Sequence, residues 1–184
     1  AAKIFPDAYE KYLALLTGGE CDDPVKAYAK RLTSGTQEEM EKAALYAMEW
    51  EGGLCGMEGN NKAEGRERAE KKANATGEEL EKILDAENAW PQIALTMART
   101  EWHFDANRFF IEEGQILKNI SKIRHIPTVI VHGRYDMVCP MENAWKLHKA
   151  LPESELVIVS DAGHGTSEVQ GSVQEAYQKF SNVL

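Results

Sequence analysis

Two polar residues in the last third of the sequence have the types and positions of a catalytic acid–base pair. Asp136 follows a short, mostly β-branched run, 127–132, and His164 follows a second such run, 156–160. Runs of this kind, each closed by a glycine, are typical of buried parallel strands. Because the loops that leave neighbouring parallel strands meet at one edge of a sheet, we expect the carboxylate and the imidazole to lie side by side. Taken singly, Asp136 would more often be a turn former, so the functional interpretation depends on the two together.

This pair has the chemistry of a general base and the group that orients it. A carboxylate that accepts the Nδ1–H of His164 fixes the tautomer of the ring and stabilises the imidazolium formed when Nε2 takes a proton from a nucleophile. Such chemistry also needs a nucleophilic serine, in a G-x-S-x-G turn that precedes the acid and the base. No such motif is present, and the serines adjacent to a glycine, Ser34 and Ser172, do not follow predicted strands. We therefore expect the nucleophile to lie outside these residues.

The elements that must position the pair belong to residues 116–184. The helical pattern of 141–151 connects the two predicted strands, and a last helix is predicted from 169 to 184. The order strand, helix, strand predicts an α/β fold with parallel strands. Two strands are too few for a sheet that is covered on both faces, so we expect further strands from another segment.

The preceding residues, 1–115, have mostly helical patterns and predict a separate helical cap domain. Apolar residues recur there at three- and four-residue spacing after prolines or capping residues, such as the capping box of Thr36 and Glu39. The segment 56–77 interrupts these patterns with charged residues, asparagine and glycine. It is predicted to be a mobile insertion, because it can contribute little to a core.

The composition argues against several classes of function. The net charge is −9 and no basic cluster with interleaved aromatic residues is present, so nucleic acid is not an expected partner. The apolar runs are too short to span a bilayer, so no membrane association is expected. Three cysteines without a C-x-x-C pair predict neither a disulfide framework nor a cysteine zinc site, and they favour a cytoplasmic location.

The segment around the acid, Gly133-Arg-Tyr-Asp-Met-Val-Cys-Pro140, resembles the proline iminopeptidases, which are prolyl aminopeptidases of the S33 peptidase family. Further segments resemble that family in the same order: Ile4–Asp7, Arg31–Ser34, Trp50–Glu51, Ala98–Phe104, Ile126–Val131 and Ala162–His164. The resemblance covers nearly the whole chain apart from the charged segment. It implies the C-terminal portion of an α/β-hydrolase fold preceded by a helical cap, with Asp136 as the acid and His164 as the base of a catalytic triad.

The resemblance also implies a binding site in the cap for the N-terminal amine of a substrate. Glu51 and Glu101 would bind the amine, and Trp50 and Trp102 would line a proline-sized pocket. A cationic amine needs carboxylate partners, and the secondary ammonium of proline offers them two N–H donors. From spacing alone, the glutamates would be surface charges and the tryptophans core residues. Their assignment to a site therefore rests on the resemblance.

We therefore expect part of a serine exopeptidase that releases N-terminal proline from peptides without a metal or a cofactor. The N-terminal half of the hydrolase core, in the same or a separate chain, would supply the nucleophilic serine and the oxyanion hole, so this chain alone is expected to be inactive. Two alternatives stay open. One is another capped α/β-hydrolase, such as an esterase or an epoxide hydrolase. The other is a non-catalytic fragment that oligomerises through an exposed strand edge.

Overall fold

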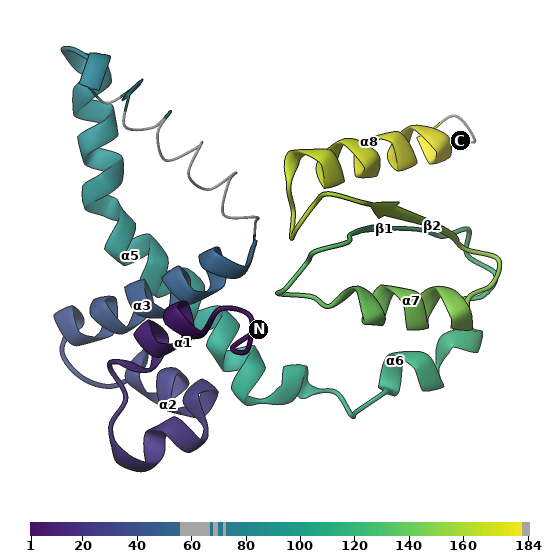
Figure 1. Cartoon of the computed structure of the whole chain (residues 1–184), viewed down its shortest axis with the longest axis horizontal. Coiled ribbons are helices and arrows are strands. Elements are labelled where there is room, and N and C mark those ends of the chain that lie inside the picture. Colours follow the sequence, from purple (N-terminus) through teal and green to yellow (C-terminus); the bar gives the residue numbers. More distant parts are fainter. Residues whose placement is uncertain (56–66, 68–69, 72, 182–184) are drawn as a thin grey trace. The chain divides into compact units, whose positions relative to one another are not determined.

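The computed structural model describes residues 1–55, 67, 70–71 and 73–181 of the 184-residue chain (Figure 1). The chain divides into two compact units. The helical unit comprises Ala2–Gly53 and Asn61–Ile111, and the sheet unit comprises Glu112–Leu184 together with Ala1 and Leu54–Asn60. The assignment of 1–115 as a cap stays a prediction, and most of the predicted insertion, 56–77, lies outside the described residues.

The helical unit is built from helices whose starts follow local rules. In chain order its described elements are α1 (Pro6–Leu13), η1 (Gly18–Asp22), α2 (Pro24–Arg31), α3 (Gln37–Cys55), α5 (Glu78–Ala106) and η2 (Arg108–Phe110). Proline occupies the first position of α1 and α2, where its missing N–H removes no helical hydrogen bond. The capping box predicted at the start of α3 is confirmed. Glu39 N–H donates to Thr36 Oγ1 over 3.3 Å, and Thr36 N–H donates to Glu39 Oε2 over 2.7 Å.

The core of the helical unit combines aromatic rings with small residues. Tyr12 and Tyr28 stack with ring centroids 4.4 Å apart, and Trp102 Nε1–H donates to Tyr12 Oη over 3.1 Å. Alanines of α3 and α5 are almost fully buried in the same core: Ala43, Ala44, Ala47, Ala94 and Ala98. Short side chains of this kind allow two helices to approach closely. Between the same helices, Gln37 Nε2 donates to Gln92 Oε1 over 2.8 Å.

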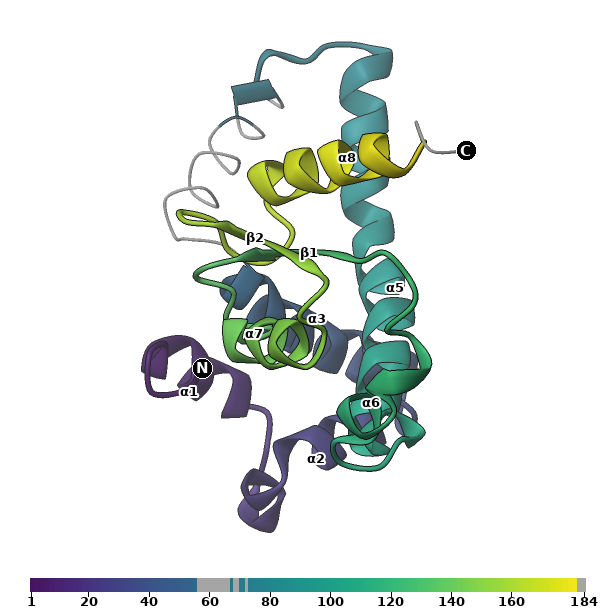
Figure 2. The same cartoon turned by 90° about the vertical axis from the view of Figure 1, so that its right-hand side faces the viewer.

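The sheet unit is a two-stranded parallel sheet with a helix on each face (Figures 1 and 2). Its described elements are α6 (Gln115–Lys118), η3 (Ile120–Lys122), β1 (Val129–Gly133), α7 (Met141–Ala150), β2 (Glu155–Val159) and α8 (Ser167–Ser181). The strands pair along their whole length, with Val129 opposite Glu155 and Gly133 opposite Val159. Helix α7 connects them on one face, and α8 lies on the other (Figure 1). The predicted strand–helix–strand unit is therefore confirmed.

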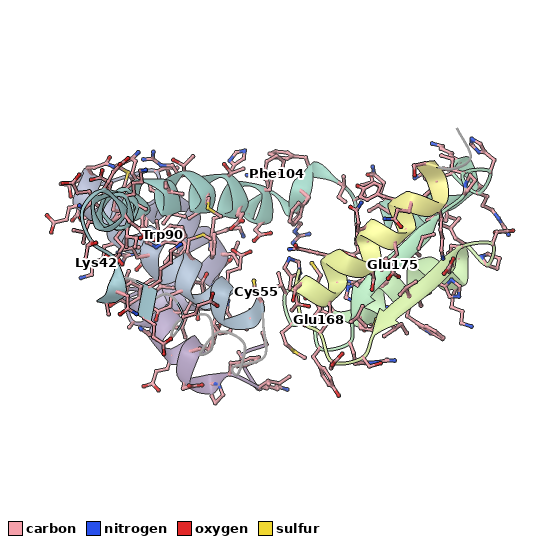
Figure 3. The ribbon with its side chains drawn as sticks, turned by 90° about the horizontal axis from the view of Figure 1, so that it is seen from above. Lys42, Cys55, Trp90, Phe104, Glu168 and Glu175 are labelled. Atoms are coloured by element: carbon pink, nitrogen blue, oxygen red, sulfur yellow. The ribbon has the colours of Figure 1, made fainter. Side chains whose placement is uncertain are left out.

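Helix α8 directs an apolar side at the sheet and exposes a charged side. Val173 of the helix and Val129 and Val131 of β1 are among the residues that line a cavity of about 230 Å³. Glu168 and Glu175, which are exposed, lie along the helix two turns apart (Figure 3). No helix in the described part of the chain, α8 included, is both long and apolar enough to cross a membrane.

Leu95 provides a test of the helical core. This residue is fully buried on α5, whereas Leu84 on the same helix is 39% exposed. Leu95→Ala should lower the free energy of unfolding by about 2–5 kcal/mol, because truncation leaves a cavity that the surrounding helices fill only in part. Leu84→Ala is the matched control and should change it by about 0.5–1 kcal/mol. Denaturant unfolding of the protein that contains this chain measures both, and equal losses would contradict the described core.

Candidate active site

The carboxylate of Asp136 is held by the backbone of the turn between β1 and α7. Val138 N–H and Cys139 N–H donate to Asp136 Oδ1 over 3.0 and 2.7 Å. The aspartate is only 7% exposed. Because these two bonds occupy Oδ1 and fix the plane of the carboxylate, the second oxygen, Oδ2, is left for a different partner.

That partner is His164, in the loop that follows β2. Its Nδ1 lies 2.9 Å from Asp136 Oδ2. A carboxylate only accepts hydrogen bonds, so in the neutral ring the proton lies on Nδ1 and the lone pair on Nε2. The imidazole side chain is 40% exposed, whereas the aspartate side chain is 6% exposed. The geometry is that of an accessible general base held by a buried carboxylate.

Direct backbone contact holds together the two loops that carry this pair. Tyr135 N–H donates to the carbonyl of Ala162 over 2.9 Å. A Cβ atom at Gly133 would lie 2.3 Å from the carbonyl oxygen of Gly163 and 2.7 Å from that of Ala162. Real Cβ contacts are never this short, so a larger residue at position 133 must displace the loop that carries His164.

Two further side chains with possible ligand atoms, those of Cys139 and His132, lie beside the pair. The sequence patterns predicted neither. The ligand atoms of Cys139, Asp136 and His164 all lie within 4.8 Å of one another. On β1, His132 Nε2 is 3.9 Å from Asp136 Oδ2. A signal for Cys139 existed, because aspartate turns bring the backbone two and three residues onward against the carboxylate. Nothing in the sequence distinguished His132 from any other residue at the end of a strand.

The helical unit contains a separate cluster of acidic residues. Glu51 on α3 and Glu101 on α5 are both half-buried, and the structure brings them together. The pKa of Glu101 is raised to about 7, mainly by burial and also by a hydrogen bond with Glu51 and the charges of Glu51 and Asp105. Burial and the charge of Glu51 also raise the pKa of Asp105, one turn further along α5.

This acidic cluster has the charge and the acceptors to bind a cation. Protonated Glu101 can donate to Glu51, but ionised Glu101 cannot. Its buried Oε2 then receives no hydrogen bond from any residue that the structure describes. An ammonium group would supply the missing donors and would favour the ionised carboxylate.

Both tryptophans expected at the substrate pocket pack in the aromatic core next to this cluster. The ring centroid of Trp50 lies 5.3 Å from that of Tyr9 and 5.6 Å from that of Tyr12. Trp102 is 5% exposed, and its Nε1–H donates to Tyr12. These contacts anchor the residues adjacent in sequence to Glu51 and Glu101. A role of the tryptophans in lining a pocket stays a prediction.

Gly133→Ala should separate Asp136 from His164, because the added methyl group collides with backbone carbonyl oxygens. Unlike the end of a flexible side chain, these atoms cannot rotate out of the way. We expect a loss of about 1–3 kcal/mol in the free energy of unfolding. The hydrogen-bonded Nδ1 proton of His164 should also lose its strongly downfield NMR resonance.

The matched control is Gly171→Ala in α8, where a Cβ atom meets nothing within 4 Å. This variant should leave the resonance in place and raise stability by about 0.5–1 kcal/mol, since alanine is the better helix former. A Gly133→Ala variant that keeps both the resonance and the stability would refute the backbone constraint.

Comparison with known proteins finds a family model and several relatives that match the chain. The family model Abhydrolase_4, described as TAP-like protein, matches residues 110–181, a range that includes Asp136 and His164. The chain is 43% identical over 169 residues to a probable proline iminopeptidase of Leptolyngbya boryana, covering 91% of this chain and 46% of that protein. It is 37% identical over 171 residues to a proline iminopeptidase of Xylella fastidiosa (strain Temecula1 / ATCC 700964), covering 92% of this chain and 48% of that protein.

A proline iminopeptidase of Arabidopsis thaliana is 40% identical over 170 residues, covering 91% of this chain and 39% of the plant protein. The chain therefore spans about half the length, or less, of the curated relatives it matches. The helices and the two parallel strands are consistent with the expected C-terminal portion of an α/β-hydrolase fold. Over 91–92% of its length the chain is therefore similar to part of these proline iminopeptidases, and its residues 110–181 match the Abhydrolase_4 model.

Proposed function

We propose that this chain provides the acid and the base of a serine exopeptidase that releases N-terminal proline from peptides. Asp136 is the acid and His164 is the base. The observation that carries the proposal is the 2.9 Å contact between His164 Nδ1 and Asp136 Oδ2, with the aspartate buried and the imidazole accessible. The names of the relatives, which are proline iminopeptidases, support the choice of substrate.

In the proposed reaction, His164 Nε2 accepts the proton of a serine hydroxyl as the serine oxygen attacks the carbonyl carbon of the first residue. The Asp136 carboxylate stabilises the imidazolium through Nδ1–H. The imidazolium then protonates the leaving amine, which gives an acyl-enzyme, and a water molecule activated by His164 releases proline. We propose that the serine and the oxyanion hole belong to the N-terminal half of the hydrolase core, in the same or a separate chain. Without that half, this chain is expected to be inactive.

Glu51 and Glu101 are the proposed binding site for the substrate amine. An N-terminal prolyl residue is cationic and has two N–H donors, whereas an internal peptide nitrogen carries no charge. Two carboxylates therefore select a chain terminus, which makes the enzyme an exopeptidase. The elevated pKa of Glu101 and the open acceptor at its Oε2 support this role. The expected cytoplasmic location, and the absence of nucleic acid and membrane partners, stay predictions.

His164→Ala tests the proposed base in the complete protein. Hydrolysis of a prolyl arylamide should fall by about 10⁴-fold or more in kcat, because the serine loses its proton acceptor. His125→Ala is the matched control, since His125 is an exposed histidine of the same unit. It should keep full activity. Unchanged turnover by His164→Ala would exclude the proposed base.

Glu101→Gln tests amine recognition and separates the exopeptidase from an esterase. Gln keeps the size of the side chain but loses its charge, so kcat/KM for a prolyl arylamide should fall by about 10- to 100-fold. An ester without an amine should be hydrolysed as before. Glu38→Gln, an exposed change on α3, is the control and should affect neither substrate.

The dependence on pH provides a second measure of the same residue. Because the pKa of Glu101 in the free enzyme is about 7, amine binding should strengthen as pH rises through 7 and the carboxyl group ionises. The ratio of kcat/KM for the prolyl substrate to kcat/KM for the ester removes the titration of His164, which both substrates share. This ratio should rise with pH in the native enzyme and stay flat in Glu101→Gln. If Glu101→Gln lowered kcat/KM equally for the prolyl substrate and for the ester, the esterase alternative would be favoured.

A further inference from the structure

The candidate acid–base pair shares its space with a thiol. Among the described residues, Asp136, Cys139 and His164 each offer a metal-ligand atom, and these atoms lie within 4.8 Å of one another. Carboxylate, thiolate and imidazole are the three side-chain ligands that Zn²⁺ uses in proteins. We propose that these three residues form a binding site for Zn²⁺.

The contact between His164 and Asp136 can accommodate a tetrahedral ion after small side-chain rotations. Zinc lies about 2.0–2.3 Å from nitrogen, oxygen and sulfur ligands, so its ligand atoms are separated by about 3.3–3.8 Å. His164 Nδ1 and Asp136 Oδ2 are closer than this, at 2.9 Å, because a proton now lies between them. Replacing the proton with an ion requires the two atoms to separate by less than about 1 Å. Three protein ligands leave a fourth position open for water.

The turn that holds Asp136 also prepares the site. Cys139 N–H donates to Asp136 Oδ1 over 2.7 Å, which fixes the backbone of the thiol residue beside the carboxylate. Since Val138 and Cys139 occupy Oδ1, Oδ2 is the oxygen that turns toward His164. The backbone contact at Gly133 keeps the third ligand in place from the neighbouring loop. Cys139 is exposed, so an ion can reach the cluster from solvent.

Zinc bound here replaces the hydrogen bond that orients the ring. The proton of Nδ1 moves to Nε2 in the neutral ring, so that Nδ1 offers its lone pair to the ion, and the thiol of Cys139 releases its proton to the solvent. His164 can then no longer serve as a base supported by Asp136. Zn²⁺ would therefore be an inhibitor of the enzyme, a consequence that rests on the proposed function. The binding of the ion itself does not.

Cobalt(II) is the probe for binding, because it takes zinc sites and a cysteine ligand gives it an intense charge-transfer absorption. The complete protein, freed of metal and reduced, is titrated with Co²⁺ and then with Zn²⁺. We expect one equivalent of thiolate-bound Co²⁺ that Zn²⁺ displaces. Cys139→Ala should remove the charge-transfer band and raise the dissociation constant by at least about tenfold. Cys21→Ala, at an exposed cysteine of the helical unit, is the control and should keep both.

Hydrolysis of the prolyl arylamide provides an independent measurement. Cys139→Ala keeps the backbone N–H that holds Asp136, and its inhibition by Zn²⁺ is measured relative to its own activity without metal. Its Zn²⁺ concentration for half inhibition should be at least about tenfold higher. The zinc site is refuted if Cys139→Ala binds Co²⁺ with the native spectrum and affinity, or if the native protein gives no thiolate band. An inactive enzyme that still gives the band would instead refute the proposed function alone.

Discussion

The close approach of two backbone segments at Gly133 is the constraint on which the candidate active site depends. The strands pair in register, so Gly133 lies opposite Val159 and both loops leave the sheet at the same level. A carbonyl oxygen of the second loop occupies the space where a side chain would begin. The positions of Asp136 and His164 are thus set by main-chain atoms, which move less than side chains. A catalytic hydrogen bond benefits from such a support, because its strength falls quickly with distance and angle.

A different constraint brings the acidic pair together in the helical unit. Alanines occupy buried positions on both α3 and α5, and the helices share one core. On α3, Ala47 lies one turn before Glu51, and on α5, Ala98 lies one turn before Glu101. Because the two helices share this core, the carboxyl groups of Glu51 and Glu101 come close enough for a hydrogen bond, and their charges would repel if both were ionised. The protein tolerates this repulsion by keeping Glu101 protonated up to about neutral pH.

The sheet unit could be predicted from the sequence because its signals are local. β-branched runs mark the strands, the helical pattern of 141–151 marks the crossover, and the positions of Asp136 and His164 after the strands predict that they meet. The contact between Glu51 and Glu101 has no such signal. Helical periodicity tells which residues share a face of one helix, but not which faces of two distant helices come together. Only a resemblance suggested that pair.

Cys139 shows a second limit of sequence reasoning. Three cysteines without paired spacing gave no sign of a ligand cluster, since metal-site patterns assume that two ligands come from one short motif of cysteine or histidine. Here an aspartate turn brings a carboxylate and a thiol together, and a neighbouring loop adds the imidazole. The cluster is a product of tertiary structure. Its components are ordinary residues when each is considered alone.

The protonated state of Glu101 affects how a cationic ligand would enter the acidic cluster. Below pH 7 this carboxyl group holds a proton, and a bound cation favours the ionised form. Uptake of the ligand at mildly acidic pH is therefore an exchange of one cation for another. The proton passes to the solvent, so the measured heat of binding would include the ionisation enthalpy of the buffer that receives it.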